Sequence, residues 1–134
     1  MHKIILSIRQ LRGVGAFKVS TCLLIVFLMT LGVYVATMPL TSYALGNMND
    51  KLLHVLVFFG FAMLMDLAIT RKPSWFWKGV PLVFYGGMIE VLQSMTEFRS
   101  FELADIAADI LGVFSYFLTK FLLKKRSVLI NKLS

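Results

Sequence analysis

The sequence predicts an all-α fold, an integral membrane bundle of four transmembrane helices with both termini in the cytoplasm. Three observations support this prediction. The 134 residues are 58% hydrophobic, with a mean hydropathy of +0.80, whereas a soluble domain is about half apolar. The apolar residues are concentrated in four long runs. The charged residues divide by sign between the two ends of these runs, as expected when each run crosses a membrane.

The four runs divide the chain into one domain and two short flanks. About 20 predominantly apolar residues cross the hydrocarbon of a bilayer. We expect the spans at residues 19–37, 52–70, 79–95 and 103–123. The first span is too long for the apolar core of a signal peptide, so we expect it to be retained. Residues 19–123 then form one transmembrane domain, which follows a basic, amphipathic segment at 1–18 and precedes a basic tail at 124–134.

The distribution of lysine and arginine predicts the orientation of the spans. Basic residues in short loops favour the cytoplasmic side. Twelve of the fourteen lie before the first span, between the second and third, or at the C-terminal end of the fourth and beyond it, and only Lys51 and Arg99 lie at the opposite ends. The loops at 38–50 and 96–102 should therefore face outward. Because the basic residues flank apolar runs, we expect contact with anionic membrane lipids and no nucleic acid partner.

Acidic residues collect at the outward ends of the spans. Six of the seven lie there: Asp50, Glu90, Glu97, Glu102, Asp105 and Asp109. Asp50 and His54 are four residues apart, as are Asp105 and Asp109, so each pair shares one helical face. An aspartate facing lipid at a helix centre costs about 2.5–3.5 kcal/mol. We therefore expect these groups to face one another, with Lys51 and Arg99, in a polar pocket just below the outer surface.

Several of these residues occur in an order that resembles the VanZ-like family. The pattern is Asp50-Lys51-x-x-His54 at the start of a span, then Glu90-x-x-Gln93, Arg99, Asp105, and Gly112 three residues after Asp109. The resemblance covers about residues 20–123, and the family usually has asparagine where this chain has Asp109. It implies a multi-pass protein of the bacterial cytoplasmic membrane. The family is named for a factor linked to teicoplanin resistance and has no agreed biochemical activity.

Eight residues make up the predicted functional site, which we call the polar cluster: Asp50, Lys51, His54, Glu90, Gln93, Arg99, Asp105 and Asp109. Three interpretations are open. The cluster binds an envelope lipid, a lipid-linked cell-wall intermediate or a glycopeptide-related ligand, with Lys51 and Arg99 engaging phosphate or carboxylate. Alternatively, it belongs to a membrane-embedded, metal-assisted hydrolase or transferase that acts on a lipid-linked substrate. In the third interpretation, it only holds the helices together.

The residue types do not assign a cofactor or a catalytic residue. A divalent cation would offset the crowded carboxylates, with His54, Glu90, Asp105 and Asp109 as candidate ligands. Oxygen ligands suit magnesium or calcium, and a histidine with carboxylates suits zinc. The sequence contains no Ser-His-Asp order, no H-E-x-x-H motif and no P-loop. Four helices would make a small transporter, so a transport pathway would require a homo-oligomer.

Two further expectations concern residues outside the polar cluster. Asp66 lies near the inner end of the second span, and we expect it to pair with Arg71 or Lys72 at the inner interface. Small residues allow close approach of membrane helices. We expect such contacts at four glycines, which are Gly60, Gly86, Gly87 and Gly112.

Overall fold

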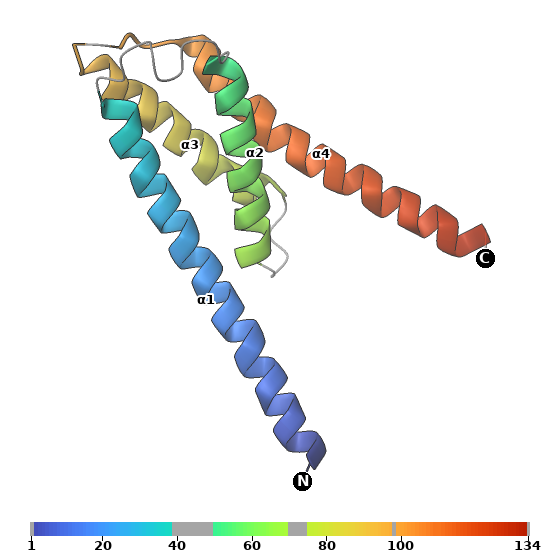
Figure 1. Ribbon diagram of the computed structural model, residues 1–134. Helices are drawn as coiled ribbons and strands as arrows, with labels where there is room; N and C mark the ends of the chain where they lie inside the picture. Colours follow the sequence, from blue (N-terminus) through green and yellow to red (C-terminus); the bar gives the residue numbers. More distant parts are fainter. Residues whose placement is uncertain (1, 39–49, 70–74, 98, 134) are drawn as a thin grey trace.

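The chain is all-helical in the computed structural model, as the sequence predicts (Figure 1). Its elements are α1 (His2–Thr37), α2 (Asp50–Ala68), α3 (Trp75–Ser94) and α4 (Leu103–Leu133). The structure describes residues 2–38, 50–69, 75–97 and 99–133, with side chains described between 14 and 130. The flanks that we separated from the membrane domain are continuous with it, since α1 begins at His2 and α4 ends at Leu133.

Three helices are long and apolar enough to cross a membrane, namely Val14–Thr37, Asp50–Ala68 and Leu103–Ile130. The fourth expected span forms the 20-residue helix α3, which falls short in hydropathy. It carries Lys78, Glu90 and Gln93 among its apolar residues. All three side chains are buried in the bundle. The polar groups of α3 therefore face protein.

Successive helices run in opposite directions (Figure 1). The ends of α1 and α3 lie at the same end of the bundle as the starts of α2 and α4. We call this end the polar end, because it holds the polar cluster. Away from it, α1 and α4 extend beyond the other two helices and diverge, so that the two termini lie well apart (Figure 1).

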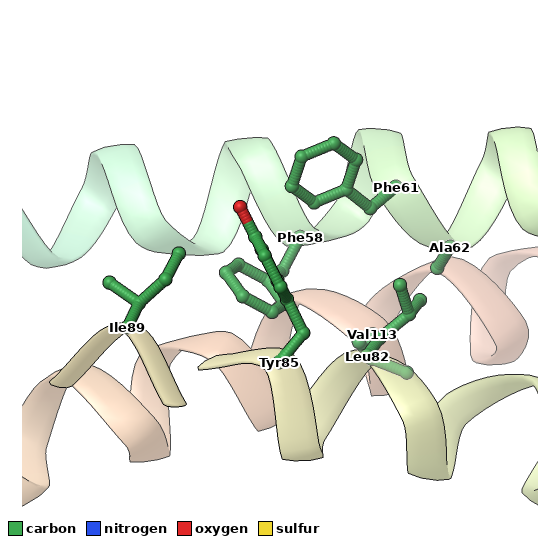
Figure 2. Close-up of a cluster of buried hydrophobic side chains, with 7 residues drawn as sticks. All are labelled: Phe58, Phe61, Ala62, Leu82, Tyr85, Ile89 and Val113. Atoms are coloured by element: carbon green, nitrogen blue, oxygen red, sulfur yellow. The ribbon is translucent and has the colours of Figure 1, made fainter. Parts of the chain in front are cut away.

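Aromatic side chains form the centre of the core (Figure 2). Phe58 and Phe61 of α2 and Tyr85 of α3 contact one another, with ring centroids between 5.8 and 6.1 Å apart. The other buried members of this core are Ala62, Leu82, Ile89 and Val113. Tyr85 also donates a hydrogen bond to the carbonyl oxygen of Met29 at 2.6 Å. One aromatic residue thus joins the core to α1.

The four expected glycine contacts are present at two positions and absent at two. A Cβ on Gly112 would collide with the backbone carbonyl of Val55, so α2 and α4 touch there. A Cβ on Gly86 would collide with the carboxylate of Asp109. At Gly60 and Gly87, no described atom lies within 4 Å of such a Cβ. Those two glycines face away from neighbouring helices, so the expectation was wrong for them.

Candidate functional site

The structure brings all eight residues of the polar cluster to one end of the bundle. Three stand on the first turns of α2, two on the last turns of α3, two on the first turns of α4, and Arg99 lies between α3 and α4. The helix directions produce this arrangement, because α2 and α4 start where α3 ends (Figure 1). The i,i+4 spacing puts Asp50 and His54 on one face of α2, and Asp105 and Asp109 on one face of α4. Contacts between α2 and α4 show that these two faces meet.

Two sets of polar contacts join α2 to α4. His54 Nδ1 lies 2.8 Å from Asp109 Oδ1. One turn nearer the polar end, Lys51 Nζ donates to Asp105 Oδ1 at 3.1 Å and to Glu102 Oε2 at 2.8 Å. Glu102 was among the six acidic residues expected at this end but not among the eight of the polar cluster. Its position three residues before Asp105 is the signal that would have added it. The hydrogen bond from Lys51 lowers the pKa of the Glu102 carboxyl below its ordinary value.

Two carboxylates of the polar cluster are almost completely enclosed. Glu90 is 0% exposed and Asp109 is 1% exposed. Glu90 Oε2 accepts a hydrogen bond from the backbone N–H of Glu102 at 3.1 Å. The second oxygen of each carboxylate, Glu90 Oε1 and Asp109 Oδ2, has no hydrogen-bond partner among the described residues. A buried polar atom without a hydrogen bond is costly, so these two oxygens are not explained by helix packing alone.

Two members of the polar cluster remain, Arg99 and Gln93. Arg99 Nη1 donates to Asp50 Oδ2 at 3.3 Å. Gln93 Nε2 lies 3.5 Å from the carbonyl oxygen of Ala36, a long contact between α3 and α1. Glu97, the remaining acidic residue of this end, is exposed. The contacts of the polar cluster therefore involve residues of all four helices.

A cavity of about 140 Å³ opens between α1, α2 and α3. Four members of the polar cluster line it at the polar end, which are Asp50, His54, Gln93 and Arg99. The rest of its wall is mainly apolar: Gly32, Val35, Ala36, Leu53, Val57, Phe58, Phe61, Tyr85 and Ile89. The sequence did not predict this cavity, because the residues of its wall are of the apolar types that occur in any packed helix. The cavity combines a mainly apolar wall with charged side chains at the polar end of the bundle, and we call this charged end its mouth.

One group of described residues could hold a metal ion. A ligand atom from each of Asp50, His54 and Asp105 lies within 4.8 Å of the others. The sequence indicated His54 and Asp105 as candidates. In place of Glu90 and Asp109, however, the group contains Asp50. Asp109 instead hydrogen bonds to the imidazole of His54.

A second ionic cluster, centred on Asp66, joins three helices at the opposite end of the bundle. Asp66 Oδ1 accepts from Lys78 Nζ at 2.6 Å, and Oδ2 accepts from Tyr116 Oη at 2.8 Å and from Lys120 Nζ. The side chains of Asp66 and Lys78 are both nearly buried. The expected partners, Arg71 and Lys72, lie outside the described residues. Asp66 therefore links α2 to α3 and α4 through residues that sequence proximity could not indicate.

Comparison with known proteins adds no further assignment. No family model, no curated protein and no solved structure matches the chain. The resemblance to the VanZ-like family therefore rests on the order of the polar residues alone.

Proposed function

We propose that this chain is a VanZ-like integral membrane factor of the bacterial cell envelope. Its cavity binds part of an amphiphile, either an envelope lipid or a lipid-linked cell-wall precursor. The observation that carries the proposal is the composition of the cavity wall, which is apolar along α2 and α3 and charged at one end. An apolar wall with a few convergent polar groups is typical of a ligand site.

The dimensions of the cavity favour partial insertion of the ligand. The lining residues of α2 extend from Asp50 to Phe61, which is about 16 Å of helix. The volume of about 140 Å³ is close to that of an engineered cavity of roughly 150 Å³ that holds one benzene ring. The cavity thus accommodates a ring or a few methylenes. The rest of the ligand would stay in the bilayer or at its surface.

The charges at the mouth favour an ionic head group. Arg99 and Asp50 line the cavity and pair with each other at 3.3 Å, a long and half-exposed contact. A guanidinium group binds phosphate or carboxylate through paired hydrogen bonds. A head group that carries phosphate would compete with Asp50 for Arg99, and an amine on the same head group would take its place beside Asp50.

The orientation is part of the proposal. All four helices cross the cytoplasmic membrane, both termini are cytoplasmic, and the polar end faces outward. The positive-inside bias of twelve of the fourteen basic residues supports this orientation. The burial of Lys78, Glu90 and Gln93 supports the crossing of α3. The cavity would then be open to the outer leaflet, where envelope precursors are used.

The family resemblance supports a link to glycopeptide action, and a glycopeptide-related ligand is the alternative occupant of the cavity. The test of this link is the inhibitory concentration of teicoplanin for a susceptible bacterium that expresses the chain. We expect the concentration to rise, and Arg99→Gln to abolish the rise while the protein remains in the membrane. An unchanged concentration would remove the antibiotic link and leave lipid binding to be tested separately.

Lipid binding is tested by untargeted mass spectrometry of lipids on gently extracted protein. Ala36→Phe should fill the cavity and lose the bound species. Val26→Phe is the matched control, because it adds the same side chain to an exposed position of the same helix. Arg99→Gln should also lose the bound species. If the wild type and all three variants carry the same lipids, and Arg99→Gln only lowers the melting temperature, the polar cluster is purely structural.

A further inference from the structure

Three side chains beside the cavity mouth present metal-ligating atoms to one another. Asp50 and His54 are one turn apart on α2, and Asp105 lies on the first turn of α4. One ligand atom from each lies within 4.8 Å of the other two. We propose that Asp50, His54 and Asp105 bind a divalent transition-metal ion. Zinc is the best match to one imidazole and two carboxylates.

The imidazole is held through one of its two ring nitrogens, which leaves the other for a metal ion. Its Nδ1 lies 2.8 Å from Asp109 Oδ1. A carboxylate accepts hydrogen bonds, so Nδ1 carries the hydrogen and the neutral ring keeps its lone pair on Nε2. Metal-ligating histidines usually donate their second N–H to a carboxylate or carbonyl, which fixes the ring and raises its basicity. Asp109 is therefore a positioning residue in this proposal.

Each of the two carboxylate ligands uses one of its two oxygen atoms in an ion pair. Asp50 uses Oδ2 to bind Arg99, and Asp105 uses Oδ1 to bind Lys51. Among the described contacts, the second oxygen of each carboxylate makes no hydrogen bond to a side chain. A cation would bind at that second oxygen, and the two basic side chains would compete with it for the same carboxylates.

A separate observation is that carboxyl groups outnumber lysine and arginine side chains at the polar end. Its five networked carboxyl groups face two basic side chains, within the part of the chain that the structure describes: Asp50, Glu90, Glu102, Asp105 and Asp109 against Lys51 and Arg99. Glu90 is fully buried, interacts electrostatically with His54, Asp105 and Asp109, and has an unpartnered oxygen. A divalent cation next to this group would offset a charge that burial otherwise makes costly.

Three protein ligands leave a coordination position open on a tetrahedral ion. Asp50 and His54 also line the cavity, so the open position would face its charged mouth. A bound ion would thereby offer a site for a phosphate or carboxylate oxygen of the ligand. This last step rests on the proposed function, whereas the cation site does not.

The cation site is tested with zinc alone, by equilibrium dialysis and metal analysis of the full-length protein in detergent. We expect stoichiometric zinc on the wild type. His54→Gln, Asp50→Asn and Asp105→Asn should each lower the affinity at least about tenfold. Glu97→Gln is the matched control, because it removes an exposed carboxylate from the same end of the bundle. It should bind zinc like the wild type.

A gain of affinity separates this proposal from simple loss of structure. Lys51→Met and Arg99→Gln each remove a competing cation from a ligand carboxylate, so both should bind zinc more tightly than the wild type. A variant that merely unfolds cannot do this. Arg99→Gln also separates the two proposals, since it should weaken lipid binding while it strengthens zinc binding.

Cobalt provides the deciding measurement of coordination. Co²⁺ bound to His54 and two carboxylates should give a visible absorption band that zinc displaces and that His54→Gln lacks. Zinc no higher than in the buffer blank would overturn the proposal. So would equal losses in Glu97→Gln and His54→Gln, or a cobalt band unchanged by His54→Gln.

Discussion

His54 Nδ1 and Asp109 Oδ1 lie 2.8 Å apart and join the first turns of α2 and α4. Both side chains are largely enclosed, at 14% and 1% exposure. The contact depends on Gly86, since the second oxygen of Asp109 occupies the space that a Cβ there would fill. This hydrogen bond therefore depends on three helices, α2, α3 and α4.

Asp109→Asn should leave the bundle as stable as the wild type, while Asp109→Leu should not. An asparagine Oδ1 can still accept the hydrogen bond from His54, and the change removes a buried negative charge. Leucine leaves the His54 N–H without a partner, at a cost of about 1–3 kcal/mol. Thermal unfolding of the two variants in detergent compares them directly. Equal destabilisation would mean that the charge of Asp109, and not its hydrogen bond, holds α2 to α4.

Gly86→Ala should destabilise the protein by about 1–3 kcal/mol, because the added methyl group meets the Asp109 carboxylate and Phe58. Gly87→Ala is the matched control, since no described atom lies within 4 Å of its Cβ. The control should be neutral or slightly stabilising, because alanine has the higher helix propensity. Denaturant titration of the helical circular dichroism signal measures both. A neutral Gly86→Ala would contradict the close approach of Asp109 to α3.

Asp66→Leu should cost about 3–5 kcal/mol, because it leaves the buried Lys78 ammonium without its carboxylate. The Lys120 side chain is half exposed, so Lys120→Gln should change stability by less than about 1 kcal/mol. Combining Asp66→Leu with Lys78→Leu should recover part of the loss, since it removes the stranded charge. A double variant as unstable as the sum of its two single variants would show that Asp66 and Lys78 are not coupled.

Acid should weaken the contact between Lys51 and Glu102. The pKa of Glu102 is lowered by its hydrogen bond to Lys51. A lowered pKa in the folded state stabilises the fold above the ordinary value, and this contribution is lost as the pH falls through the folded-state value. Lys51→Met should therefore move the Glu102 pKa upward, toward its ordinary value. An NMR titration of the labelled Glu102 carboxyl measures the shift, and an unchanged pKa would contradict the contact.

The polar cluster was predictable because its residues follow short-range rules. Charges at helix ends report on sidedness, and i,i+4 spacing reports on a common face, so Asp50 with His54 and Asp105 with Asp109 could be placed without a structure. The partners of Asp66 could not. Lys78 and Lys120 reach it from other helices, 12 and 54 residues away, and that proximity depends on how the helices pack.

The cavity and the glycine contacts were also beyond prediction from the sequence. The cavity wall consists of apolar residues such as Val57 and Ile89, which look the same in a filled core. Gly86 and Gly87 are adjacent, yet only Gly86 faces α4. The rotation of each helix about its axis decides these features, and hydrophobic periodicity is too uniform in a membrane helix to reveal it.

The account depends most on the polar end of the bundle facing outward, and cysteine accessibility in intact cells tests this most directly. In a Cys22→Ser background, Glu97→Cys places a thiol at the polar end and Ser127→Cys places one near the C-terminal end of α4, both at exposed positions. We expect a membrane-impermeant maleimide to label Glu97→Cys before lysis and Ser127→Cys only after it. Labelling of Ser127→Cys in intact cells, with Glu97→Cys protected, would contradict the account.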